Sequence, residues 1–337
     1  MNHPLPNTLR RRLMASASGL CLCLGHGAAQ GQGQGQGQGH YPDRPITLVV
    51  PFGPGGIADL VARAVGEALA RSLGQAVVVD NRPSAGSIVA SQLVAKATPD
   101  GHTLLLMSNG HAVSVGLFRK LGYDPLRDFA PISLLSSFDL GLFSAAGGRF
   151  ASLAELLAFA RAQPGKLNIG TVAVGSTQHL AAKLLETQAG IDALVVPYKA
   201  SPAVLTALRS GEIDLAVEIL APMLPQVQAG LVRAQAVAGE QRHPLLPQVP
   251  TVAQAGVAGY QVASWNALAA TAGTPPAVIE RLNRAVQEAL ASTEVQRRLA
   301  PLGVRLAGST PAAMQALLAS EIKRWGEVIR RARIEPD

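Results

Sequence analysis

The sequence contains almost no cysteine. Of its 337 residues, only Cys21 and Cys23 are cysteines, and both lie within the first 29 residues. We expect that segment to be removed during export, which leaves a mature chain without cysteine. This absence excludes disulfides, a thiolate nucleophile and a metal site ligated by cysteine.

Aromatic and charged residues are also scarce. Aromatic residues make up 4% of the chain, too few for the stacking surface that binds single-stranded nucleic acid. The formal net charge is +7, and the three arginines at 10–12 account for part of it. The remaining basic residues are scattered and form no run, so we expect no nucleic-acid partner.

Metal-binding motifs are missing as well. The seven histidines show no spacing such as His-Glu-x-x-His, so the sequence predicts no metal. Hydrophobic residues nevertheless make up 48% of the chain, which is a globular composition long enough for two domains.

The N-terminus has the composition of a secretory signal peptide. Three arginines precede an apolar stretch at 13–24, which is too short to span a bilayer comfortably. Small residues at 27–29 predict cleavage near Ala29 and a periplasmic protein. Export by the general or by the twin-arginine route stays open. A Gln-Gly repeat at 30–40 predicts a flexible linker.

The clearest pattern is a strand, a glycine turn, a helix and a second strand. An apolar run at 46–50 is followed by a turn at 52–56 and by helical spacing from Ile57 to a stop at Gly74. A strand at 77–79 completes a βαβ unit. The free N–H groups and positive dipole end of this helix, beside a glycine turn, predict an anion site.

The following residues repeat this pattern. A turn at 81–86 precedes a helix at 87–97, and a strand at 103–107 ends in a turn at 108–111. In a parallel sheet such turns gather along one edge, where ligands bind.

A second α/β unit follows from about residue 129. Two strand-like runs are expected at 131–135 and 140–144. Further strands are expected at 166–171, 195–198, 213–217 and 232–237, with helices at 153–161, 178–189, 202–210 and 222–229. Three C-terminal helices, at 275–292, 294–302 and 311–329, have no predicted strand between them. We expect them to cover the first domain, with chain crossings near residues 140 and 260.

A dinucleotide fingerprint gives a competing hypothesis. Gly53-x-Gly55-x-x-Ala58 follows a strand, and Asp80 ends the next one, as in NAD-dependent oxidoreductases. Two prolines stiffen this turn, the spacing to Asp80 is slightly long, and export removes the chain from nicotinamide cofactors. We therefore expect no cofactor.

Three polar residues allow more than one interpretation. Ser176 and His179 have the spacing of a nucleophile and its base, but no carboxylate obviously orients the histidine, so a helix cap beside a ligand-contacting histidine is favoured. Asp59 suits either capping of its helix or ligand contact. Glu218 suits either recognition of a cationic group or bracing of a loop. No enzyme is predicted.

Ten ordered motifs carry a resemblance to a known family. They are the segments 41–46, 50–59 (Val-Pro-Phe-Gly-Pro-Gly-Gly-Ile-Ala-Asp), 79–83, 99–105, 123–129, 164–167, 175–180, 196–199 and 246–251, and Trp265. From Tyr41 to the C-terminus the chain resembles the Bug (Bordetella uptake gene) family, the extracytoplasmic solute receptors of tripartite tricarboxylate transporters.

This resemblance implies a fold and a function. The fold is a type II periplasmic binding protein, an α/β protein of two domains joined by two crossover strands with a ligand cleft between them. Domain 1 comprises 41–140 and 261–337, and domain 2 comprises 141–260. The function is capture of a small carboxylate (a di- or tricarboxylate, an acidic amino acid or an aromatic acid) by a monomer that delivers it to membrane permease subunits. A sensor of the same fold is the alternative within the family.

The resemblance also implies the ligand-binding residues. In domain 1 they are Phe52, Gly55, Gly56, Ala58, Asp59, Ser84, Ala85, Ser108 and Asn109. In domain 2 they are Thr171, Gly175, Ser176, Thr177, His179, Tyr198, Lys199 and Glu218. Backbone N–H groups and hydroxyls at helix N-termini would then hold the carboxylate, directly or through water.

This chain departs from the family pattern at several of these loops. The family usually has glycine at the positions of Ser84, Ser87, Ala90, Ala200 and Ala267, aspartate at Glu218, tyrosine at His102, and a Ser-Ala-Gly-type segment at 171–173. Added side chains fill volume and restrict backbone angles. We therefore expect a shifted ligand specificity on an unchanged fold.

Overall fold

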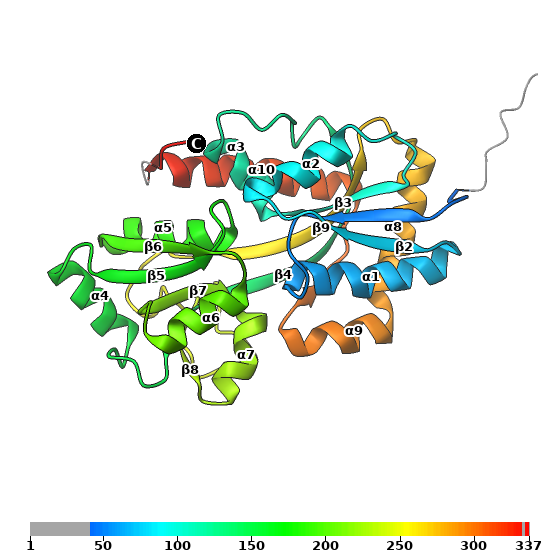
Figure 1. Ribbon diagram of the computed structural model, residues 1–337. Coiled ribbons are helices and arrows are strands. Elements are labelled where there is room, and N and C mark those ends of the chain that lie inside the picture. The colour runs from blue at the N-terminus through cyan, green and yellow to red at the C-terminus, as the bar shows by residue number, and fades with distance from the viewer. Residues whose placement is uncertain (1–40, 332–333, 337) are drawn as a thin grey trace, which may run out of the picture. The chain divides into compact units, whose positions relative to one another are not determined.

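Three short apolar runs form parallel strands that end at one edge of the sheet. The computed structural model describes residues 41–331 and 334–336 (Figure 1). In it, β1 (Ile46–Val50) lies between β2 (Val77–Asn81) and β3 (Thr103–Ser108). Both pairings are parallel, as the predicted βαβ pattern requires.

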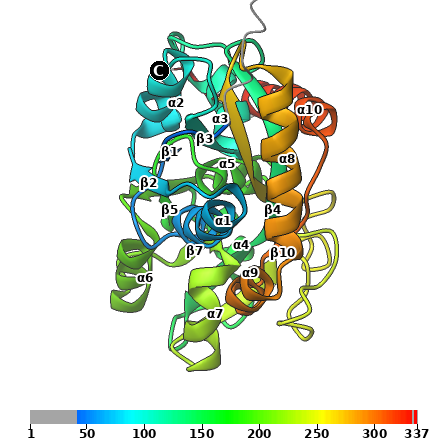
Figure 2. The ribbon, with the colours of Figure 1, turned by 90° about the vertical axis from the view of Figure 1, so that its right-hand side faces the viewer.

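The helix after β1 buries an apolar stripe on one face of this sheet. α1 (Ile57–Leu73) packs against α8 (Pro276–Ala291) and α9 (Thr293–Leu299), and α1 and α8 lie on the same side in Figure 2. It ends at Gly74, whose φ of 72° lets the Gly74 N–H donate to the Ala70 carbonyl. The predicted start and end of this helix are confirmed.

Three more helices and a 3-10 turn lie on the other face. They are η1 (Ala85–Ser87), α2 (Ile88–Ala95), α3 (Asn109–Leu117) and α10 (Pro311–Arg331), and α10 packs along α3 (Figure 1). The turn predicted at 108–111 is wrong in part, because Asn109 already begins α3. The Ser108 hydroxyl caps this helix by accepting a hydrogen bond from the Gly110 N–H. This cap offsets the weak helix propensity of the glycine and asparagine in the first turn of α3.

One long strand replaces the two runs predicted at 131–135 and 140–144. β4 (Phe129–Ala145) is continuous; it pairs first with β9 (Ala263–Thr271) and then with β7 (Leu215–Ile219). The register between β4 and β9 shifts at two bulges, near Pro131 and before Ser136. These bulges interrupt the alternation of apolar and polar residues, although the strand itself continues. A gap in the apolar pattern therefore did not mark a turn.

The remaining strands and helices repeat the βα order. The strands are β5 (Leu167–Val172), β6 (Ala193–Tyr198) and β8 (Val232–Val237). The helices are α4 (Leu153–Ala162), α5 (Thr177–Ala189), α6 (Ser201–Ser210) and α7 (Leu220–Gln228). The strand order from one sheet edge to the other is β2-β1-β3-β9-β4-β7-β5-β6. These elements agree with the predicted second α/β unit.

The C-terminal helices differ from expectation in two ways. A two-residue strand, β10 (Arg305–Leu306), follows η2 (Ala300–Leu302) and pairs with β4, so the predicted absence of a strand between these helices is wrong. Such a short strand has no periodicity of its own and depends on its partner. α10 also contacts α5, so it covers more than the first α/β unit.

β4 and β9 connect two α/β lobes, as the predicted fold class requires. We call β1–β3, β9, β10, the 129–139 part of β4 and the helices α1–α3 and α8–α10 the first lobe. The second lobe contains the rest of β4, β5–β8 and α4–α7. All described residues belong to one compact unit, and the predicted domain boundaries at 140 and 260 stay a prediction.

Membrane-spanning helices and metal-binding clusters are both absent from the described part of the chain. Among residues 41–331 and 334–336, no helix combines the length and the apolar character needed to cross a bilayer. Within the same ranges, no group of three histidine, cysteine or acidic residues is placed to hold a metal ion. The predicted signal peptide and Gln-Gly linker lie outside the described residues.

Candidate ligand-binding site

The turn before α1 is shaped by glycine and braced by a buried carboxylate. Gly55 has a φ of 83°, a conformation that side chains other than glycine rarely adopt. The Asp59 carboxylate, 2% exposed, accepts hydrogen bonds from the Gly55 N–H at 3.0 Å, Arg63 Nε at 3.0 Å and Asn81 Nδ2 at 3.0 Å. Burial raises the pKa of Asp59, but these hydrogen bonds outweigh burial and hold the pKa below its usual value. Asp59 therefore braces the turn before α1, and its direct contact with a ligand stays a prediction.

The rest of this turn is open at its tip. An ideal Cβ on Gly53 or Gly55 would meet no atom within 4 Å, so a ligand could approach the backbone there. Gly56 is the extended N-cap residue of α1 and has no capping side chain, which leaves the first N–H groups of α1 without a side-chain acceptor. Ala58 is buried in the apolar cluster under the turn, and Phe52 packs at its margin.

The second turn of the first lobe contains an unusual serine. Ser87, 3% exposed, adopts a φ of 62° at the start of α2, a conformation that is unfavourable for residues other than glycine. Ser84 accepts a hydrogen bond from the Val89 N–H at 3.0 Å, and the neighbouring Ala85 is exposed. Glycine would suit this backbone better than the serine present here.

The start of α3 is rigidly hydrogen-bonded. His111 Nδ1 accepts from the Ser108 N–H at 3.1 Å, and burial lowers the pKa of His111 to about 4, so its ring is neutral at pH 7. Asn109 is fully buried, and its Oδ1 accepts from Trp325 Nε1 at 2.9 Å. Its Nδ2 donates to no described residue. A buried amide donor of this kind is suited to a ligand oxygen.

The facing turn of the second lobe ends in a helix cap. Ser176 Oγ accepts from the His179 N–H at 3.1 Å and donates to the Val172 carbonyl at 3.0 Å. Its only proton is therefore engaged with the backbone, which agrees with the predicted cap and not with a nucleophile. Thr171 is fully buried, and its Oγ1 has no partner among the described residues.

The predicted residues at the ends of β6 and β7 have different environments. Tyr198 donates its hydroxyl to Glu212 at 2.7 Å; burial and this carboxylate raise the pKa of Tyr198 to about 12. Lys199 is exposed, whereas Glu218 is fully buried and accepts from Gln178 Nε2 at 2.7 Å. Burial raises the pKa of Glu218 above its usual value, even though its hydrogen bonds act in the opposite direction.

The two lobes meet where these turns lie. An ideal Cβ on Gly175 of the second lobe would stand 3.5 Å from the Gly86 backbone and 3.6 Å from the Phe118 ring of the first. Thr177 Oγ1 lies 3.1 Å from Ser264 Oγ on β9. The structure thus brings together the predicted residues around the starts of α3 and α5. The Tyr198 hydroxyl is engaged with Glu212, and Lys199 is exposed to solvent.

Sequence patterns did not single out three polar residues at this junction. Asn266 and Ser264 lie on β9 among apolar neighbours, and Ser136 lies on β4 between Leu135 and Ser137. A polar residue inside an apolar strand was the available signal, but only the strand pairing shows that these residues lie between the lobes. Asp80, required by the dinucleotide hypothesis, is instead paired with Arg82 at 2.9 Å.

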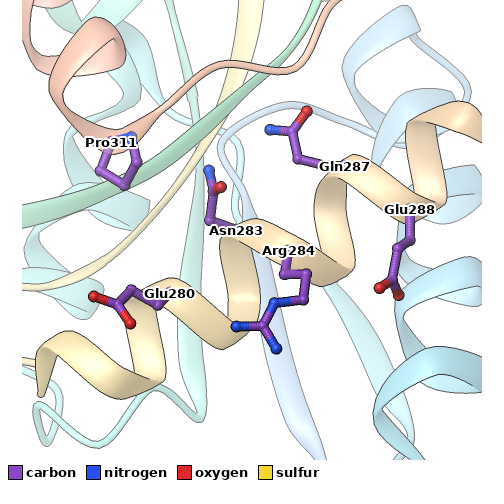
Figure 3. Close-up of a pocket in the computed structure, with 6 residues that line it drawn as sticks. All are labelled: Glu280, Asn283, Arg284, Gln287, Glu288 and Pro311. Atoms are coloured by element: carbon purple, nitrogen blue, oxygen red, sulfur yellow. The ribbon is translucent and has the colours of Figure 1, made fainter.

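A surface hollow lies elsewhere, along α8. It has a volume of ≈ 400 Å³ and is lined by Glu280, Asn283, Arg284 and Gln287 of α8 and by Pro311 (Figure 3). Its lining has mixed charge and includes none of the predicted ligand-binding residues.

Comparison with known proteins gives a consistent result. Residues 61–334 match a family described as the tripartite tricarboxylate transporter family receptor. A "UPF0065 protein in tcbD-tcbE intergenic region" of Pseudomonas sp. (strain P51) is 40% identical over 87% of this chain and 88% of that protein. Protein BugT of Bordetella pertussis (strain Tohama I / ATCC BAA-589 / NCTC 13251) is 36% identical over 86% of this chain and 90% of its own.

Solved structures resemble the fold closely. The periplasmic binding protein BugD has a TM-score of 0.82 at 31% identity, and R. palustris Rpa4515 with adipate has 0.83 at 36%; each match covers 88% of this chain and 100% of the other. MatC (Rpa3494) from Rhodopseudomonas palustris with bound malate has a TM-score of 0.80 at 34% sequence identity. The match covers 86% of this chain and 100% of that one.

Proposed function

Because the chain belongs to the tripartite tricarboxylate transporter receptor family, we propose that it is an exported receptor that captures a small organic carboxylate between its lobes and delivers it to membrane permease subunits. The family is one of solute-binding receptors, and two structural neighbours hold the carboxylates adipate and malate. The delivery step and the periplasmic location rest on the family and on the predicted signal peptide.

The observation that carries this proposal is the meeting of helix starts at the lobe junction. α3 and α5 begin at turns that lie against each other across the junction, where Gly110 and Gly175 are neighbours. Ile219 and Ala221 of the second lobe join the apolar cluster that buries Ile57 at the start of α1. Helix N-termini offer N–H groups and a positive dipole end, which favour a carboxylate.

The buried polar groups at these turns would recognise different parts of the ligand. Asn109 Nδ2 and the hydroxyl of Thr171 would donate to the carboxylate, while Glu218 would accept from a cationic or hydroxyl group elsewhere on the ligand. Binding would require both lobes, because the groups come from both. Closure of the lobes would then be favoured in proportion to the ligand's preference for the closed state.

A thermal-shift screen of the purified protein tests this function. The panel contains dicarboxylates, tricarboxylates, acidic amino acids, aromatic acids and NAD. A carboxylate at one hundred times its dissociation constant should add about 2.7 kcal/mol of stability and raise the melting temperature. A shift with NAD and with no carboxylate would overturn the receptor function and restore the dinucleotide hypothesis.

A further inference from the structure

A row of polar side chains crosses three strands at the lobe junction. Asn266 on β9 is directly paired with Ser108 on β3 and with Ser136 on β4. Directly paired residues of antiparallel strands have their side chains on the same face of the sheet. The three side chains therefore form one row, which we call the Asn266 row.

The Asn266 row is sealed from solvent and incompletely hydrogen-bonded. Asn266 is 1% exposed, and its Oδ1 has no hydrogen-bond partner among the described residues. Ser136 is fully buried, and its Oγ is also without a partner in that part of the chain. The Ser108 hydroxyl, in contrast, accepts a hydrogen bond from the Gly110 N–H. Buried polar groups are normally paired, so two adjacent unpaired ones point to a missing partner.

The row lies where a ligand between the lobes would be. Two residues earlier on the same strand face, Ser264 Oγ lies 3.1 Å from Thr177 Oγ1 at the start of α5 in the second lobe. Two residues later, Leu268 belongs to the apolar cluster around α1 and α8. On the neighbouring strand β3, the row ends at Ser108, which caps α3. The polar face of β9 is thus confined to the stretch between the two helix starts.

The chemistry of the row favours an uncharged partner. The arginine on the strand beside Ser136 is Arg305, and Asp139 accepts two hydrogen bonds from it at 2.9 and 3.1 Å, so this cation is already engaged and does not favour a second carboxylate there. An amide and a serine hydroxyl each donate and accept. A ligand hydroxyl also does both and would satisfy the two unpaired atoms.

We propose that the Asn266 row is a specificity subsite for a hydroxyl group on the bound carboxylate. This inference rests on the proposed receptor function and adds the ligand class, a hydroxy acid. A site with buried groups that need hydrogen bonds rejects an analogue that lacks the hydroxyl, because those groups are then left unpaired.

Calorimetric titration with matched acids tests the subsite. The pairs are malate and succinate, 3-hydroxyadipate and adipate, and 4-hydroxybenzoate and benzoate, which differ within each pair by one hydroxyl. The wild-type protein should bind at least one hydroxy acid about tenfold or more tightly than its partner. Asn266→Leu, which keeps the volume and removes the hydrogen bonds, should reduce that ratio to about twofold or less while the affinity for the acid without the hydroxyl is retained.

Two further variants keep the test decisive. Ser136→Ala removes the other unpaired group and should lower the same ratio if Asn266→Leu does not fold. Asn168→Leu is the control, because Asn168 lies on β5, where its side-chain amide donates a long hydrogen bond of 3.4 Å to the Glu212 carbonyl. The affinity ratio of this variant should equal that of wild type. Equal affinities within every pair, with a carboxylate still bound, would show that the row holds only a water molecule and would overturn the subsite. No binding of any acid would overturn the receptor function itself.

Discussion

The buried carboxylate of Asp59 holds the turn at the start of α1 in place. It accepts from the turn itself, from its own helix through Arg63 and from β2 through Asn81. Asn81 Nδ2 also donates to the Phe52 carbonyl at 2.9 Å, so one small network fixes both ends of the turn. The open glycine backbone of this turn is therefore preorganised before a ligand arrives.

Replacement of this carboxylate should lower stability. Asp59→Ala leaves three donors without an acceptor, so the free energy of unfolding at pH 7 should fall by about 1–3 kcal/mol. The folded pKa of Asp59 lies below its unfolded value of about 4, so its contribution is present above that value and is lost as pH falls through the folded pKa. Urea unfolding at neutral and acidic pH measures this difference.

Asp80→Ala is the matched control for that experiment. Asp80 is half-exposed and pairs with Arg82 at the surface, so its removal should cost less than about 1 kcal/mol. Equal losses in the two variants, or a loss for Asp59→Ala that persists at the acidic pH, would refute the bracing role.

Sequence patterns could predict Asp59 but not Asn266, for a physical reason. A carboxylate in the first turn of a helix after a glycine turn is a local signal, since its partners are set by helix geometry. The role of Asn266 depends on pairing with Ser108 and Ser136, which lie 158 and 130 residues away along the chain. Strand register is not readable from the strand itself.

Among the helices and strands, the predictions succeeded where the structure depends on residues close together in the sequence. The glycine stop of α1 and the serine cap of α5 follow from short-range chemistry, and both are present. β4, β10 and α3 depend on partners distant in sequence, and there the prediction was incomplete. Ser136 and Asp139 look like turn residues, yet β9 pairs with both of them and keeps β4 extended.

α10 illustrates how a distant element supports the predicted site. Trp325 is fully buried, and its Nε1 donates to Asn109 Oδ1 and to Glu321 Oε2, each at 2.9 Å. This contact fixes the Asn109 amide with its oxygen toward α10, which leaves Nδ2 available for a ligand. The C-terminal helix therefore orients a side chain at the start of α3.

Loss of this hydrogen bond should affect both stability and binding. Trp325→Phe keeps most of the apolar ring but removes its N–H, so we expect a loss of about 1–2 kcal/mol in the free energy of unfolding and weaker carboxylate binding. Guanidinium unfolding and calorimetry measure the two effects. Trp265→Phe is the control, because Trp265 Nε1 has no hydrogen-bond partner among the described residues. If both variants lose equal stability and Trp325→Phe keeps its affinity, the orienting role is wrong.

At the scale of the whole molecule, the account depends on contact between the lobes. Gly175 and Gly86 approach backbone to backbone, and the Phe118 ring fills the space beside Gly86. Both glycines have positive φ, of 83° and 60°. An ideal Cβ on Gly86 would clash with the Phe118 ring, and one on Gly175 would already be in van der Waals contact with Gly86 and Phe118, so these small residues leave room for the lobes to close further on a ligand.

A side chain at Gly175 should weaken binding more than it weakens the fold. Gly175→Ala places a methyl group between the lobes, whereas Gly190→Ala adds a methyl group that meets no atom within 4 Å. Gly190 has a φ of 61°, so both variants carry a similar backbone penalty of about 1–2 kcal/mol. Only Gly175→Ala should also reduce carboxylate affinity.

Isothermal titration calorimetry of wild type, Gly175→Ala and Gly190→Ala tests whether the ligand is bound between the lobes. The ligand is the acid that raises the melting temperature of the wild type most. We predict one carboxylate per chain, bound by wild type and Gly190→Ala with similar affinity and by Gly175→Ala at least about fivefold more weakly, since about 1 kcal/mol of closure energy corresponds to that factor. Equal affinity in all three proteins would place the ligand away from the lobe junction and contradict the account.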